Sequence, residues 1–295
     1  MPKYSEEQFN NWRKPPSDTE SSKLENAERM IREAIWNDPV LNKLSIEIYG
    51  QGSYANDTNV KLNSDIDINV RLSSTIFYEL PPNRKKEEFG YIDSPYTFYQ
   101  YKNDIHTALV KYFAEENVKR KNKCIEIKGN TYRVQADVVP TFKLNHHFEN
   151  SSIRVGSKFI CDLGQEHQNY GLQHIEEGKK KNAATGKKFK RTTRIFKNIR
   201  YKMIEDGILV NPKITSFLIE SSIWNVPNEV FNNNVTWLET VRQCIIYLYN
   251  HLEDESLVKD WTEVSKCLYL FPGRKWSIAD LKQFLFDMWN YLEFK

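Results

Sequence analysis

Short stretches in the first half of the chain alternate between apolar and polar residues. The segments 44–50 and 64–72 have a period of two, which is typical of strands with one buried face. In the second segment the apolar face consists of Ile66, Ile68 and Val70. Further strands are predicted at 124–129, 131–142 and 152–160, with Gly129 and Asn130 as a hairpin turn between the first two.

Apolar residues with a helical period flank this region. The segments 5–13, 19–38 and 101–117 are predicted helices, and from about residue 165 most of the chain is helix-like. We therefore expect an α+β fold. The sheet-containing first half and the helical second half are expected to pack against each other across a cleft.

Composition narrows the class of protein. The chain has 295 residues, of which 40% are apolar and 27% are charged, as in soluble globular proteins. A formal net charge of +3 argues against unselective coating of nucleic acid, so an anion site must be local. Because no run approaches the ~18 apolar residues of a membrane span and the N-terminus has no apolar signal core, we expect a cytoplasmic protein.

Cysteine and histidine spacings do not indicate a zinc site. No Cys-x-x-Cys pair occurs, and we expect the cysteines to be reduced thiols in the core. His146 and His147 are neighbours on a predicted strand, so their side chains point to opposite faces. The cysteines are Cys124, Cys161, Cys244 and Cys267.

Acidic residues occupy the polar face of the strand at 64–72. Asp65 and Asp67 lie two positions apart, so they project from one face roughly 6.5–7 Å apart along the strand. Two such carboxylates repel each other unless a cation lies between them. Asp137 interrupts a second predicted strand and could join them. For a lone Asp, a solvated strand face is the favoured explanation. Three acids together instead favour Mg²⁺, or Mn²⁺, and two metals ~4 Å apart would serve phosphate chemistry.

The dipeptide Gly52-Ser53 precedes Asp65 by eleven intervening residues. This order of "GS", "DID" and the later Asp137 resembles the DNA polymerase β-type nucleotidyltransferases. The resemblance implies that Gly52 and Ser53 hold a triphosphate and that Asp65, Asp67 and Asp137 bind two metals. Three amides could each read a base edge or make a structural hydrogen bond, and Gln51 is the one assigned to nucleotide binding. They are Gln51, Asn69 and Gln165.

A basic segment at 179–202 contains eleven Lys or Arg residues among 24 and no acid. It is either a solvated helix face or a surface for a triphosphate or another polyanion. On a helix that begins near Phe189, the apolar stripe is predicted to be buried, and four other residues share a second face. The stripe comprises Ile195, Phe196, Ile199 and Met203, and the second face Lys190, Arg194, Lys197 and Tyr201.

The stretches "RIFKNIR" and "ITSFLIESSIWNVPN" resemble the paired helices of the template-independent branch, which includes oligoadenylate synthases, cyclic GMP-AMP synthases and bacterial CD-NTases. The resemblance implies that Lys197 and Ser216 contact the donor triphosphate, with Thr215 as a neighbour that could serve. A helix N-cap is the alternative role of Ser216.

The chain as a whole looks most like bacterial CD-NTases of anti-phage signalling (CBASS), close to the CdnE- or CdnB-like groups. This implies a two-lobed nucleotidyltransferase fold with its active site in the cleft. The catalytic lobe, residues 1–160, would have a mixed β-sheet, and the helical C-terminal lobe would span 161–295. The long helix 19–38 would span both lobes.

The implied activity is the metal-dependent joining of nucleoside triphosphates (ATP, UTP, GTP or CTP) into a cyclic di- or oligonucleotide, with release of pyrophosphate. We expect a monomer that meets its effector protein only through the product and does not sense double-stranded DNA. An enzyme that tails RNA or nucleotidylates a protein or small molecule is the alternative, and a binding module that has lost turnover is a third hypothesis. Base choice, linkage and ring size stay open.

Overall fold

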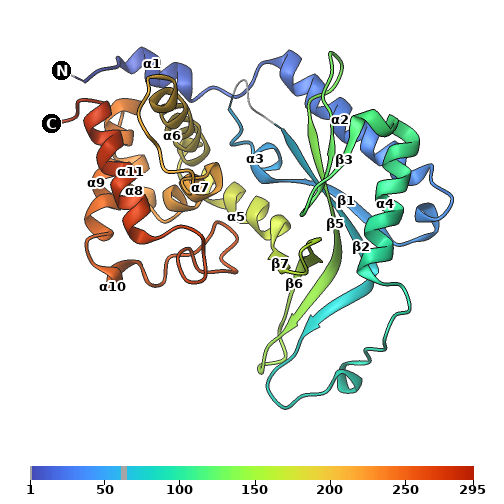
Figure 1. The fold of residues 1–295 in the computed structure, drawn as a ribbon. Helices are drawn as coiled ribbons and strands as arrows, with labels where there is room; N and C mark the ends of the chain where they lie inside the picture. Colours follow the sequence, from blue (N-terminus) through green and yellow to red (C-terminus); the bar gives the residue numbers. More distant parts are fainter. Residues whose placement is uncertain (1, 61–64) are drawn as a thin grey trace. The chain divides into compact units, whose positions relative to one another are not determined.

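The computed structural model describes residues 2–60 and 65–295, so residue 64 of the predicted strand 64–72 lies outside the described part (Figure 1). The chain divides into two compact units. The sheet unit comprises Ser17–Tyr54 and Ser64–Leu172, and the helical unit comprises Met1–Pro16, Ala55–Asn63 and Gln173–Lys295. The α+β class predicted from the sequence is confirmed.

The predicted domain limits differ from these units. The boundary after residue 160 is wrong because the sheet continues through two antiparallel pairs to Asn169, and the division falls after Leu172. The first long helix, α2 (Asp18–Trp36), lies within the sheet unit and does not span both. Two segments that precede residue 160 also pack with the helical unit, so a single cut in the sequence cannot describe the division.

The sheet is mixed. Its strand order is β1-β2-β5-β4-β3; β6 pairs with β5, and β7 pairs with β6. β2 runs parallel to β5, and the other pairs are antiparallel. The strands are β1 (Ile46–Gln51), β2 (Ile66–Glu79), β3 (Val118–Arg120), β4 (Ile125–Ile127), β5 (Ala136–His147), β6 (Ile153–Ile160) and β7 (Glu166–Asn169).

Helices α2 and α4 (Phe98–Phe113) provide the apolar cover of the sheet, beside which both are drawn in Figure 1. α4 begins at a capping box in which Thr97 and Gln100 bond each other's backbone. The predicted stripe of β2, from Ile66 to Val70, is completely buried in this core. Each such side chain stabilises the fold by about 1.5–3 kcal/mol, which fixes the register of the strand and hence the face on which Asp67 lies.

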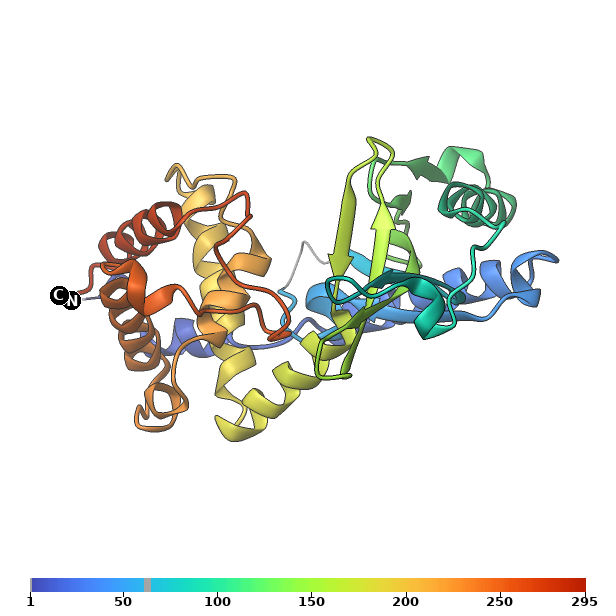
Figure 2. The same cartoon turned by 90° about the horizontal axis from the view of Figure 1, so that it is seen from below.

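The helical unit has its own apolar core, to which α6 contributes Ile195, Phe196, Ile199 and Met203 as predicted. The two ends of the chain lie side by side in Figures 1 and 2. Near them, the backbone N of Lys3 donates a hydrogen bond of 3.0 Å to O of Leu292. The helices are α1 (Glu6–Trp12), α5 (Gly171–Ala184), α6 (Lys188–Glu205), α7 (Ser216–Trp224), α8 (Asn228–Asn232), α9 (Trp237–His251), α10 (Glu255–Val258) and α11 (Ile278–Tyr291).

The described cysteines are thiols that form no disulfide, as expected. Cys124, Cys161 and Cys244 are buried, but Cys267 is partly exposed, so its predicted place in the core is wrong. Within residues 2–60 and 65–295, no helix has the length and apolar character needed to cross a membrane.

Candidate active site

Four polar residues form one row across the strands β1, β2, β5 and β4. Gln51 is paired with Asp67, Asp67 with Asp137, and Asp137 with Glu126. Directly paired residues on neighbouring strands project from the same face of a sheet. The register therefore brings together Asp67 and Asp137, which the sequence placed on two separate strands. Asp65 lies immediately before β2, where its Oδ2 accepts a hydrogen bond of 3.3 Å from Gln135.

The electrostatics of this row are those of crowded carboxylates. Burial, and then the charges of Asp137 and Asp65, raise the pKa of Asp67 to about 7. Burial, Asp137 and Glu126 also raise the pKa of Asp65. The surrounding protein therefore favours the protonated forms of Asp65 and Asp67, whereas a bound cation would favour their ionised forms.

Gly52 brings the backbone directly against Asp67. It follows β1 and begins the short helix α3 (Gly52–Ala55), which also contains Ser53. Its φ of 68° is in the left-handed region, and a Cβ atom at this position would overlap Oδ2 of Asp67. The Gly-Ser dipeptide and the second acid of the "DID" motif are thus neighbours in space.

Gln51 is buried in a chain of amide and hydroxyl groups. Its Oε1 accepts hydrogen bonds from Nδ2 of Asn69 (3.1 Å) and of Asn169 (2.9 Å). Asn69 in turn accepts a bond of 2.7 Å from Thr141 and is buried, which favours the structural role over base reading for Asn69. Gln165 lies exposed in the turn between β6 and β7.

The carboxylates of this row are of the kind that binds a hard divalent cation. Oδ1 of Asp137 is buried and has no hydrogen-bond partner among the described residues. In that part of the chain, however, no group of three or more His, Cys, Asp or Glu side chains is arranged so that it could hold a metal ion. Magnesium usually takes only one or two carboxylates, with waters and substrate phosphates as its other ligands. Binding of Mg²⁺ by Asp65, Asp67 and Asp137 stays a prediction, in which waters and substrate phosphates would supply the other ligands.

The sequence did not indicate that Glu126 and Cys124 lie beside Asp137. Glu126 extends the row on β4, and its carboxylate forms an ion pair with Lys121. Cys124 is buried, and burial together with Asp137 raises the pKa of its thiol to about 12. The alternation of "CIEI" predicted a strand, but only the pairing of β4 with β5 places Glu126 beside Asp137.

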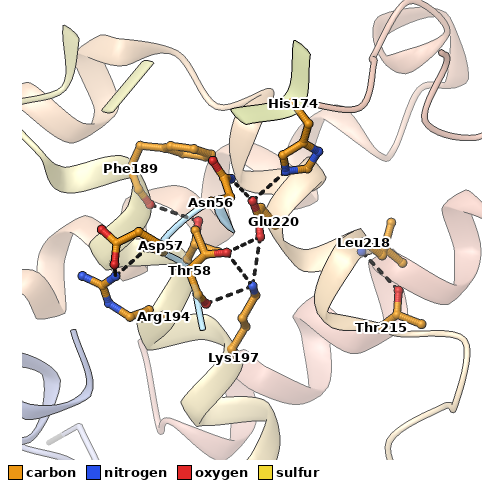
Figure 3. Close-up of polar contacts among 11 residues, drawn as sticks. Asn56, Asp57, Thr58, His174, Phe189, Arg194, Lys197, Thr215, Leu218 and Glu220 are labelled. Atoms are coloured by element: carbon orange, nitrogen blue, oxygen red, sulfur yellow. Dashed lines mark hydrogen bonds and ion pairs between the residues drawn. The ribbon is translucent and has the colours of Figure 1, made fainter. Parts of the chain in front are cut away.

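The basic face of α6 is buried and not solvated. Lys190, Arg194 and Lys197 are only 5%, 4% and 2% exposed, so the interpretation as a solvated face is wrong for them. Nζ of Lys197 donates to O and Oγ1 of Thr58, both at 3.0 Å, and to Oε2 of Glu220 at 2.9 Å (Figure 3). These three bonds use all three protons of the ammonium group. The predicted contact of Lys197 with a triphosphate stays a prediction, and these bonds argue against it.

Glu220, on α7, is the buried acid that pairs with Lys197, and the sequence did not indicate it. Its carboxylate accepts hydrogen bonds from Asn56, Thr58 and His174 and pairs with Lys197. Burial by itself would raise the pKa of Glu220, but the charge of Lys197 and the bonds from His174 and Thr58 hold it well below its usual range. The carboxylate is therefore ionised in the core of the helical unit.

Ser216 is the first residue of α7, and Thr215 caps the helix. Oγ1 of Thr215 accepts a hydrogen bond of 3.2 Å from the backbone N of Leu218 (Figure 3). The capping role considered for Ser216 is therefore wrong. Because Thr215 only accepts in this bond, its O–H proton is still able to donate. The predicted phosphate contact of Ser216, with Thr215 as a neighbour that could serve, stays a prediction.

Comparisons with known proteins identify the family. The family model described as the cGAS/DncV-like nucleotidyltransferase C-terminal helical domain matches residues 176–293. A curated relative, the cyclic dipyrimidine nucleotide synthase CdnE of Cecembia lonarensis, is 50% identical over 295 residues, which is 100% of both chains. The chain belongs to the CD-NTase family. The family and the enzyme class expected from the sequence, a nucleotidyltransferase that makes cyclic nucleotides, are confirmed.

Two solved CD-NTase structures agree with this fold over nearly the whole chain. The CdnE cyclic dinucleotide synthase of Elizabethkingia meningoseptica, with GTP and Apcpp, has a TM-score of 0.82 and 33% identity, covering 99% of this chain and 100% of the other. The CdnE c-UMP-AMP synthase of Rhodothermus marinus, with Apcpp and Upnpp, has a TM-score of 0.85 and 28% identity, covering 97% and 95%.

Proposed function

We propose that this CD-NTase joins two pyrimidine nucleoside triphosphates into a cyclic dinucleotide with release of pyrophosphate, in a Mg²⁺-dependent reaction. The observation that carries the chemistry is the row of Asp67 and Asp137, with Gly52 against Asp67 and Asp65 immediately before β2. The choice of pyrimidines rests on the activity for which the Cecembia relative is named. We further propose that the product is a second messenger of anti-phage (CBASS) signalling.

The roles of the side chains follow from their chemistry. Asp65, Asp67 and Asp137 would hold Mg²⁺, which supplies charge neutralisation of the triphosphate and a lower pKa of the attacking hydroxyl. The backbone at Gly52 has no side chain to keep a phosphate away. The hydroxyls of Ser53 and Ser216 would donate hydrogen bonds to triphosphate oxygens. Most of the rate acceleration would come from positioning and from electrostatic stabilisation.

The reaction is tested with the four nucleoside triphosphates together, with Mg²⁺ or Mn²⁺, by pyrophosphate release and by mass spectrometry of the product. The variant Asp65→Asn/Asp67→Asn should form no cyclic product. Asp93→Asn, which changes an exposed aspartate of the sheet unit, is the matched control and should retain activity. Full activity of the double variant would contradict the proposal.

The identity of the product separates the remaining alternatives. A phosphatase-resistant compound with the mass of a cyclic dipyrimidine supports the proposal. A purine in the ring keeps the reaction class but overturns the base assignment. A ladder of extended RNA would instead indicate a tailing enzyme. The basic segment gives little support to that alternative, since Lys188 and Lys197 bond carbonyl and side-chain oxygens of the helical unit.

A further inference from the structure

Part of the stretch between the Gly-Ser dipeptide and the acids belongs to the helical unit. Ala55–Asn63 packs with the helical unit, whereas the residues before and after it belong to the sheet unit. Ser53 lies three positions before Asn56, and Asp65 lies two positions after this stretch. Asn56 and Thr58 are completely buried. Residues 56–58, which follow the Gly-Ser dipeptide closely, therefore belong to the helical unit and not to the sheet unit that contains the dipeptide.

The carboxylate of Glu220 accepts hydrogen bonds from the side chains of this segment. In Figure 3, side chains from the segment 55–63, from α5 and from α6 point toward Glu220. Oε1 accepts hydrogen bonds from Nδ2 of Asn56 and, at 2.9 Å, from Nε2 of His174. Oε2 accepts them from Oγ1 of Thr58 and, at 2.9 Å, from Nζ of Lys197. We call these five residues the Glu220 cluster.

Two further contacts hold the same segment. Nη1 of Arg194 donates to O of Asp57 at 2.6 Å and to its Oδ1 at 3.2 Å (Figure 3). Gly178 lets α5 approach so closely that a Cβ there would overlap Oδ1 of Asn56. Three consecutive residues, 56–58, are thus held by side chains of α6 and α7 and by close packing of α5.

Hydrophobic side chains of similar volume would stabilise a core as well as a buried ion pair does, so stability alone does not explain the cluster. Its hydrogen bonds differ from apolar contacts in being directional, and they fix the segment in one position. A binding group that is already held in place loses less conformational freedom when the ligand binds, which lowers the Kd of the ligand.

We propose that Glu220 is a positioning residue of the nucleotidyl transfer. By fixing Asn56 and Thr58, it sets the position of the Gly52-Ser53 backbone, three to six residues upstream, for the triphosphate. The inference rests on the proposed function, because it assigns the triphosphate to that dipeptide. Glu220 is not a catalytic residue, since it would act through the segment and not on the reacting atoms.

The test uses a variant that keeps the shape of the cluster. Thr58→Val removes the hydroxyl that bonds both Glu220 and Lys197, and Thr58→Ser restores it. Thr240→Val is the matched control: its hydroxyl is also buried in the helical unit and bonds a carbonyl, that of Thr236, outside the cluster. Glu220→Gln removes the charge and serves as a second variant if it folds.

Thr58→Val is expected to raise KM for the nucleoside triphosphate, and Kd for a non-hydrolysable analogue, by about 5- to 10-fold. The effect on kcat should be much smaller, because the ground state and the transition state lose the same binding energy. Thr58→Ser should restore both constants. The control should lose similar thermal stability without any change in KM.

The proposal is overturned if Thr58→Val loses stability like Thr240→Val but keeps KM and Kd within twofold of wild type. An equal loss in both Thr58 variants, without rescue by Ser, would also overturn it. A wild-type protein that releases no pyrophosphate from any triphosphate would refute the proposed function instead. The analogue-binding measurement would then still test the cluster.

Discussion

At the scale of single residues, Lys197 is where the sequence-based role and the structure make different predictions. A lysine that only contacts triphosphate should be removable without loss of stability. In the structure, however, Lys197 neutralises the fully buried Glu220, and breaking such a pair leaves an uncompensated charge in the core.

We expect Lys197→Met to lower the free energy of unfolding by about 3–5 kcal/mol, measured by urea denaturation. Lys202→Met is the control, because Lys202 lies on the same helix and makes only surface ion pairs, worth at most about 1 kcal/mol. A Lys197→Met protein that is as stable as wild type but does not bind nucleotide would favour the phosphate role.

Gly52 provides a second residue-level prediction. Gly52→Ala adds both backbone strain, at φ 68°, and a Cβ that overlaps the carboxylate of Asp67. Gly90→Ala is a matched control, since Gly90 has a φ of 72° and no atom lies within 4 Å of the position that an added Cβ would take. Both variants should lose about 1 kcal/mol of stability from strain. Only Gly52→Ala should lose pyrophosphate release, by roughly 100-fold, because the reacting groups are displaced. Equal activities of the two variants would contradict a role of Gly52 in the site.

At the scale of elements, local patterns predicted much of the fold and half of the site. The alternation around Ile66 and Val70 identified β2, and the spacing of Gly52, Asp65 and Asp67 identified the motif. The row through Glu126 depends on pairing between β4 and β5, which the local pattern of "CIEI" does not contain. β7 was missed because "EHQN" has no apolar face, and Glu220 because one acid in the apolar "SFLIESSIW" does not reveal its partners.

Asp162 lies between β6 and β7 and pairs with residues of α4 and β3. This pairing should make the stability of the protein depend on pH. Hydrogen bonds from Arg120, on β3, and from the buried Lys102, on α4, lower the pKa of Asp162 to about 2. Because the folded-state pKa lies below the unfolded value of about 3.9, this contribution is complete above pH 4 and is lost as the pH falls toward 2.

The Asp162→Asn variant should therefore lose about 1–2 kcal/mol at pH 7, a value reduced for the partial exposure of Asp162, and this difference from wild type should shrink below pH 4. Urea denaturation from pH 7 to pH 3 measures it. A difference that stays constant over this range would show that charge pairing is not the cause. The exposed pair of Lys86 and Asp93 supplies a control, since Asp93→Asn should change stability very little at any pH.

At the scale of the whole molecule, the closely spaced acids of the candidate site lower the stability of the fold when no cation is bound. Asp67 is partly buried beside two other carboxylates, and its pKa is raised to about 7, so its charge opposes folding when no cation is bound. Functional sites commonly contain residues that are unfavourable for stability alone. The proposed Mg²⁺ and triphosphate would reverse this sign, because a ligand that binds only the folded protein stabilises it by mass action.

Asp67→Asn should therefore have opposite effects in two conditions. In EDTA at pH 8, the variant should be at least as stable as wild type, since a repulsive charge has been removed. With Mg²⁺ and a non-hydrolysable nucleotide at about 100 times its Kd, wild type should gain about 2.7 kcal/mol and the variant little. Asp93→Asn should gain as much as wild type. If Asp67→Asn is less stable than wild type in EDTA, the carboxylate has a structural role. If the variant and wild type gain the same stability from Mg²⁺ and nucleotide, Asp67 is not a metal ligand. The two conditions thus separate what Asp67 does for the fold from what it does for the substrate.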